Sequence, residues 1–208
     1  MPTTEHPMQA LAAYLPGNTF EPVVQYVHHY KVHLTVTKKR KSVLGDYRHS
    51  GVPGTNHRIS VNGNLNKYEF LITLLHEMAH LLTYEQHKNK VEPHGLEWKN
   101  NYSCLLIDFV QRKVFPTDIE QALQKSILNP AATANGETEL MLVLRSYNAT
   151  QKLGFVSIND LPDEALFATE DGRVFKKIGK RTKRFQCLEI NTGRHYIFSA
   201  LSEVKPVP

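Results

Sequence analysis

Apolar side chains recur at helical spacing in the second quarter of the chain. No Gly or Pro interrupts residues 67–91, and Asn66 and Glu69 stand where an N-cap and its capping-box carboxylate are expected. The pattern predicts a helix with one apolar stripe buried in a core. The stripe consists of Leu71, Leu74, Leu75, Met78, Leu81 and Leu82.

Upstream of this helix the pattern changes from helical to alternating. Residues 8–30 predict two short helices, which Pro16-Gly17-Asn18 separates, with Thr19 as the cap of the second. Two strands with alternating apolar and polar positions follow, at residues 32–36 and 58–62, and residues 43–47 predict a returning strand between them. We expect the strands at 32–36 and 43–47 to form a hairpin with the basic residues 38–41 at its tip. This tip is either a solvated turn or a patch that faces phosphate groups.

The rest of the chain predicts helices followed by a β-rich end. Helical spacing continues over residues 98–114, a further helix starts after Pro116, and residues 137–147 predict a short one. From Gly154 the pattern is β, with turns at Asp171-Gly172 and Asn191-Thr192-Gly193. The fold class is therefore α+β. The expected organisation is a domain over residues 1–128, a linker with a bridging helix over 129–153, and a small β domain over 154–208.

Composition indicates an ordinary soluble protein. The 208 residues are 41% hydrophobic and 22% charged, and no apolar run approaches the roughly 18 residues of a membrane span. The N-terminus lacks the basic and apolar regions of a signal peptide. Cys104 and Cys187 are far apart, and Cys104 lies on an apolar helical face as an expected buried free thiol. We therefore expect a cytoplasmic protein with no membrane partner.

Positive charge is concentrated in the β-rich end. Residues 171–208 carry a net charge of +6, whereas the other 170 residues carry −1. Such a cluster predicts either sequence-independent binding to DNA through phosphate contacts or a solvated basic face without a partner. Its residues are Arg173, Lys176, Lys177, Lys180, Arg181, Lys183 and Arg184.

The predicted helix over 67–91 also carries a metal-binding motif, His76-Glu77-Met78-Ala79-His80. Residues four apart share one helix face, so both imidazoles can reach a single tetrahedral Zn²⁺ at about 2 Å. Glu77 lies about 100° around the helix from His76. From there it can take a proton from water beside the metal without being a ligand. The alternative is a solvated or core pair of histidines without a metal.

A third ligand is available after the helix. His87 faces the same way as His80 but lies about 10 Å further along a straight helix, too far to share a metal. Pro93 and Gly95 predict a break that lets His94 fold back toward the motif. Glu92 and Glu97 are rival ligands, because a carboxylate can complete the ligand set of a zinc hydrolase.

At these residues the chain resembles the SprT-like (Spartan-type) zinc metalloproteases. Their pattern is HExxH, a variable loop, then His-Gly followed by an aromatic residue, here His94-Gly95 and Trp98. The resemblance covers roughly residues 44–106 and includes the strand and turn over 59–65. It implies a zincin-like metallopeptidase domain over 1–128, one catalytic Zn²⁺ held by His76, His80 and His94, and Glu77 as base. It also implies hydrolysis of peptide bonds in protein substrates, in several members proteins associated with DNA.

Some features of this family do not transfer. Many bacterial members end in a zinc ribbon with two cysteine pairs, whereas this β-rich end contains only Cys187. We expect a zinc-ribbon-like antiparallel unit that hydrophobic packing stabilises in place of a second zinc. No single residue stands out as the donor to an oxyanion, for which the candidates are Tyr47, Arg48, His49 and His57.

Two other functions remain open at this point. One is a DNA- or partner-binding regulator with a structural or vestigial zinc site, which would have no use for Glu77. The other is a zinc hydrolase that acts on a non-peptide substrate.

Overall fold

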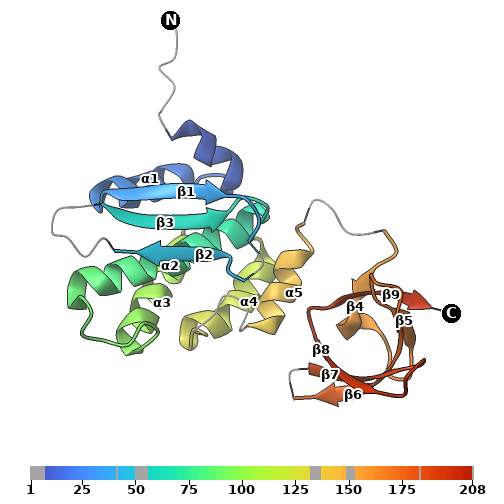
Figure 1. Ribbon diagram of the computed structural model, residues 1–208. Coiled ribbons are helices and arrows are strands. Elements are labelled where there is room, and N and C mark those ends of the chain that lie inside the picture. Colours follow the sequence, from blue (N-terminus) through green and yellow to red (C-terminus); the bar gives the residue numbers. More distant parts are fainter. Residues whose placement is uncertain are drawn as a thin grey trace, which may run out of the picture. The chain divides into compact units, whose positions relative to one another are not determined.

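The computed structural model describes residues 8–40, 42–49, 56–131, 137–148, 153–182 and 184–207. The chain divides into two compact units, Met1–Asn148 and Ala149–Pro208 (Figure 1). Residues 138–145, expected in a bridging segment over 129–153, belong to the first unit. Within the described ranges, no helix is both long enough and apolar enough to cross a membrane.

The first unit is a mixed α+β structure. In the part of it that the structure describes, a 3₁₀ helix and one α-helix precede its three strands, and four α-helices follow them (Figure 1). The elements are the 3₁₀ helix η1 (Gln9–Tyr14), α1 (Phe20–His29), β1 (Val32–Thr37), β2 (Gly45–Arg48), β3 (His57–Asn62), α2 (Lys67–His87), α3 (Leu96–Gln111), α4 (Thr117–Leu128) and α5 (Thr138–Arg145).

The sheet has the order β1-β3-β2, which differs from the expected hairpin. β3 lies between the other two strands, parallel to β1 and antiparallel to β2. The hairpin prediction was wrong because β3 carries the most deeply buried side chains of the three, Ile59 and Val61, and takes the centre. This order leaves β2 at an edge of the sheet.

The basic segment after β1 is not simply a solvated turn. Lys38 and Lys39 are exposed, but Arg40 folds back onto β3. Its Nε donates to Asn62 Oδ1 at 2.8 Å and its Nη1 to Ser60 Oγ at 3.0 Å. Asn62 in turn donates from Nδ2 to the carbonyl of Val43 at 2.9 Å. Arg40 and Asn62 therefore fasten the chain before β2 to the central strand, and Lys41 lies outside the described residues.

Helix α2 has the cap that the sequence predicted, and the predicted stripe is buried except for Leu82, which is half-buried. Asn66 Oδ1 accepts hydrogen bonds from the backbone N–H groups of Tyr68 and Glu69 at 3.1 and 3.0 Å. The amide of Asn66 also donates to the carbonyl of Leu144 at 2.7 Å, which ties α5 to the start of α2. The helix ends at His87, because Lys88 adopts a positive φ of 55°. It packs against β2, β3 and α3.

Helix α3 follows the third candidate ligand and supports α2. Trp98, Tyr102 and Phe109 are buried along one side of it. Cys104, predicted to be buried, is exposed. It lies two residues from Tyr102, about 200° around the helix, and so faces away from this buried stripe.

The second unit is a single antiparallel sheet (Figure 1). Four strands form a meander, and the last strand returns beside the first strand of that meander. The elements are β4 (Val156–Ser157), the 3₁₀ helix η2 (Ile158–Asp160), β5 (Leu166–Ala168), β6 (Val174–Arg181), β7 (Arg184–Glu189), β8 (His195–Ser199) and β9 (Glu203–Val207), in the sheet order β4-β9-β5-β6-β7-β8.

The strands of the second unit curve around a small apolar core (Figure 1). The two predicted turns are confirmed, since Gly172 and Gly193 have φ values of 81° and 67°. The expected antiparallel unit that hydrophobic packing stabilises is confirmed, and its described residues form six paired strands around a core of its own. The buried core residues are Ile158, Phe167, Phe175, Phe185, Cys187, Ala200 and Val204.

Candidate metal centre

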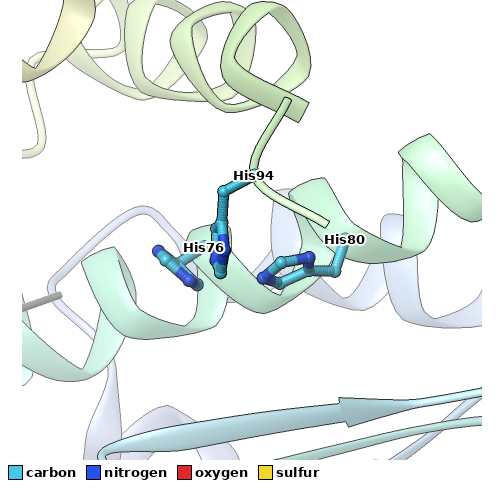
Figure 2. A group of neighbouring side chains, drawn as sticks. All are labelled: His76, His80 and His94. Carbon is cyan, nitrogen blue, oxygen red and sulfur yellow. The ribbon is translucent and has the colours of Figure 1, made fainter. Parts of the chain in front are cut away.

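Three histidines converge at one point on the first unit. His76 and His80 project from one face of α2, and His94 approaches them from the segment before α3 (Figure 2). One ring nitrogen from each histidine lies within 4.8 Å of the corresponding nitrogens of the other two. Among the described residues this is the only such group, and it includes neither Glu92 nor Glu97. The structure thus brings together the three histidines that the sequence singled out.

The surroundings of the histidines favour neutral imidazoles. Burial, with smaller contributions from the neighbouring imidazoles, lowers the pKa of His76 to about 3 and that of His80 to about 4. Burial also lowers the pKa of His94. The Nε2 atom of His94 is buried and has no hydrogen-bond partner among the described residues. Three neutral nitrogen donors, one of them otherwise unsatisfied, suit a divalent metal ion of the zinc type.

Trp98 forms the wall behind the three rings. Its ring centroid lies 4.7 Å from that of His76, 5.3 Å from His80 and 4.7 Å from His94. It is fully buried and is the only tryptophan in the sequence. Trp98 therefore limits the positions that the imidazoles can adopt, and its fluorescence is expected to report on metal binding.

Glu77 is a buried carboxylate beside the histidines. Only 7% of the residue is exposed. Burial and, to a smaller extent, the charge of Asp46 raise its pKa to about 8, while Arg40 and the backbone N–H of Tyr47 act in the opposite direction. A carboxylate with a raised pKa is a stronger proton acceptor once ionised, which is the property expected of a general base.

A cleft of about 470 Å³ opens onto the histidines. Residues 42–47, which include the start of β2, form one wall. His76, Glu77, His80 and Tyr84 of α2 contribute to the lining, as does the segment from Lys88 to His94. Ligand-type side chains, a proton acceptor and a sheet edge therefore share one open site.

The four candidate oxyanion donors have different positions. Tyr47 and His49 line the cleft. Tyr47 Oη is hydrogen-bonded to His57 Nδ1 at 2.9 Å, and His57 Nε2 lies 3.2 Å from Glu85 Oε1, so His57 supports Tyr47 from behind. Arg48 is exposed and paired with Asp46 at 2.7 Å. His87, in the last turn of α2, is not among the residues that line the cleft.

The sequence patterns did not identify three residues of this site, namely Arg40, Gly45 and Asp46. Asp46 and Arg40 were placed on or next to a hairpin that the structure does not contain. Gly45 carried a usable signal, because a glycine inside a strand often marks close approach of another group. Its neighbour here is Glu77.

The basic residues of the second unit do not form the single patch that was expected. Lys177 is 4% exposed, and its Nζ donates to the carbonyl of Leu161. Lys176 pairs with Glu164, and Arg173 with Asp171. Lys183 lies outside the described residues. Three exposed cations remain around the turn between β6 and β7, without an acidic partner among the described residues: Lys180, Arg181 and Arg184.

Comparison with known proteins gave one match. No curated protein and no solved structure matched the chain. The model of the SprT-like family matches residues 15–106. That segment contains the three strands of the first sheet, all of α2 and the three histidines. Residues 15–106, a little less than half of the chain, are therefore similar to the SprT-like family.

Proposed function

We propose that this protein is a zinc-dependent metallopeptidase with a zincin-like catalytic domain that cleaves peptide bonds in protein substrates. The observation that carries the proposal is the convergence of His76, His80 and His94 next to the buried carboxylate of Glu77. The SprT-like match over the same residues supports it. A purely structural zinc site would not need an open cleft or a proton acceptor beside the ligands, and both are present.

The residues divide the chemistry between them. His76, His80 and His94 would hold the ion, which when bound supplies the Lewis acidity that activates water and polarises a carbonyl group. Glu77 accepts the proton of the attacking water and then transfers it to the leaving nitrogen. Tyr47 lines the cleft, and its bond to His57 fixes the position of its hydroxyl.

The exposed edge of β2 is suited to an extended peptide. The N–H of Asn62 donates to the carbonyl of Leu44 at 2.9 Å, so Leu44 of the β2 side and Asn62 of β3 form a hydrogen-bonded pair. Pairing alternates in antiparallel strands, so the main-chain groups of Gly45 and Tyr47 point away from β3 toward the open edge. A substrate segment added as a strand would pair with the main-chain groups of Gly45 and with the carbonyl of Tyr47, while the N–H of Tyr47 faces Glu77. This requirement selects protein segments that can become extended.

Metal removal and restoration test the proposal. We expect the zinc-loaded protein to cleave a chemically unfolded protein, to lose this activity on treatment with a chelator, and to regain it with one equivalent of zinc. Mass spectrometry of the products measures cleavage, and Trp98 fluorescence follows the metal in the same samples. Metal binding at the three histidines without cleavage of any unfolded substrate would instead support the non-enzymatic alternative.

We further propose that the turn between β6 and β7 contacts nucleic acid, which would direct the peptidase to DNA-associated proteins. The supporting observation is that Lys180, Arg181 and Arg184 are exposed and form no ion pair within the described part of the chain, whereas Arg173 and Lys176 are paired with acids. Cations that are free of such pairs are the ones available to phosphate groups.

Salt dependence distinguishes this turn from a merely soluble basic surface. We expect the triple variant Lys180→Gln/Arg181→Gln/Arg184→Gln to bind double-stranded DNA more weakly. The slope of log Kd against log salt concentration should decrease by about 2 to 3, because each phosphate contact contributes roughly 0.9 to it. Arg173→Gln, which removes a paired cation, is the matched control and should leave the slope nearly unchanged. Equal slopes for the triple variant and the wild type would contradict the proposal.

A further inference from the structure

Gly45 occupies the point where β2 comes closest to α2. A Cβ atom at this position would lie 2.6 Å from Glu77 Oε1, 2.8 Å from Glu77 Cγ and 2.8 Å from Thr73 Cγ2. Separations below about 3 Å are well inside van der Waals contact between such atoms. The carboxylate of Glu77 therefore lies in space that exists only because residue 45 has no side chain.

The backbone at Gly45 has little freedom to move away from Glu77. On one side, the Arg40 and Asn62 side chains fix the segment just before β2 to β3. On the other side, Thr73 and Glu77 belong to the buried face of α2, where Leu74 and Met78 are almost fully covered. A side chain added between these two elements would have to displace the end of Glu77, which is the most mobile group present.

A second group of the same strand faces the carboxylate. The backbone N–H of Tyr47 lies close enough to Glu77 to lower the pKa of its carboxyl group. This agrees with the sheet register, because the N–H of Tyr47 is one of the groups that point away from β3. β2 thus provides the space for the Glu77 carboxylate and also places a backbone N–H beside it.

We propose that Gly45 is a positioning residue for the base: the absence of a side chain in β2 at this point sets where the Glu77 carboxylate lies relative to the three histidines. The inference rests on the proposed function, because it concerns the residue assigned as the base there. It adds that β2, the strand proposed to pair with the substrate, also sets the position of the proton acceptor, Glu77.

A double-mutant cycle tests the placement without using activity. Gly45→Ala should lower the Tm of the first unit by about 3–8 °C, the range expected for overpacking in a protein of this size. The unfolding of this unit can be followed by Trp98 fluorescence. In a Glu77→Ala/Thr73→Ser background, which removes all three close atoms, the same substitution should change Tm by less than half as much.

Other glycines provide matched controls for the cycle. At Gly63, an added Cβ would lie 2.7 Å from Val36 Cγ1, and its three nearest atoms belong to Val36, Tyr14 and Thr37, none of which is part of α2. Gly63→Ala should therefore destabilise the protein equally in both backgrounds. At Gly17 nothing lies within 4 Å of the added atom, so Gly17→Ala should have little effect in either.

Kinetics provides the second measurement. Zinc-loaded Gly45→Ala should show a kcat about 10- to 100-fold below the wild type, the scale of loss expected when a catalytic group is displaced by about 1 Å. Its KM should change less than threefold, and its zinc affinity, measured by titration of Trp98 fluorescence, should stay within about threefold. A general loss of structure would instead lower both the zinc affinity and kcat.

The possible outcomes separate the inference from the function on which it rests. An active wild type with an equally active Gly45→Ala variant, or an equal Tm decrease in both backgrounds, overturns the role of Gly45 and leaves the peptidase proposal intact. A wild type without Glu77-dependent cleavage overturns both. If Gly45→Ala fails to fold by itself but folds in the Glu77→Ala/Thr73→Ser background, the steric placement is supported. Failure to fold in both backgrounds overturns it.

Discussion

Glu77→Gln is expected to lower kcat for peptide hydrolysis by about 10²- to 10⁴-fold while zinc remains bound. The amide has almost the same shape as the carboxylate, so the buried position beside β2 stays filled. It cannot, however, accept a proton from water. Because Glu77 is not one of the three converging ligands, zinc affinity should change little. Steady-state kinetics on a peptide with one cleavage site, together with zinc titration, measures both effects.

The control for this substitution is Glu97→Gln. Glu97 lies in the first turn of α3, near the site, but outside the metal-binding group. Its replacement should reduce kcat less than threefold. If Glu77→Gln retained more than a tenth of the wild-type kcat, another group would have to serve as the base and the assignment of Glu77 would be wrong.

His94→Ala is expected to weaken zinc binding at least 100-fold, because it removes one of the three protein ligands. Loss of a residue that only hydrogen-bonds to a ligand lowers metal affinity by about 10- to 100-fold, so loss of the ligand itself should lower it by at least 100-fold. Zinc at 100 times its Kd stabilises the wild type by about 2.7 kcal/mol. In His94→Ala this stabilisation should fall to about 0.4 kcal/mol or less at the same zinc concentration. Thermal unfolding with and without zinc, and competition with a chromogenic chelator, measure the two effects.

His87→Ala is the matched control for His94→Ala. His87 also lies close to the site in sequence, but α2 places it in its last turn, outside the metal-binding group. Zinc affinity should remain within about threefold of the wild type. A His94→Ala variant with wild-type affinity would show that two histidines and some other group hold the metal.

The metal-binding helix could be predicted from sequence because its signals are local. The capping of α2 by Asn66 depends on residues two and three positions away, and the stripe from Leu71 to Leu81 depends on helical periodicity alone. The approach of His94 to this helix was predicted from the break at Pro93 and Gly95. Short separations along the chain made these predictions possible.

The arrangement of the first sheet depends on distant residues and was predicted incorrectly. β1 and β2 are neighbours in sequence, but burial of Ile59 and Val61 places β3 between them. This order is also what leaves β2 at the edge beside the histidines. The alternating patterns identified the strands, whereas their pairing required knowledge of which strand buries most apolar surface.

Charge counting was equally limited at the basic end of the chain. The count treated Lys177 and Lys180 alike, although Lys177 is buried against Phe185 with its Nζ on a backbone carbonyl and Lys180 is exposed. The difference arises from the pairing of β6 with β7 and from the segment that places Leu161 over the core. Neither can be inferred from the order of the charges.

The contrast between the two cysteines makes the native sequence suitable for attaching a single probe. Cys104 is exposed on α3, whereas Cys187 is buried in the core of the second unit, where burial raises the pKa of its thiol to about 11. Thiol reagents react with accessible thiolates, so a maleimide dye should modify Cys104 alone. Cys104 and Trp98 are six residues apart on the same helix, about 9 Å along its axis. A donor and an acceptor for energy transfer can thus be installed near the histidines without altering any residue.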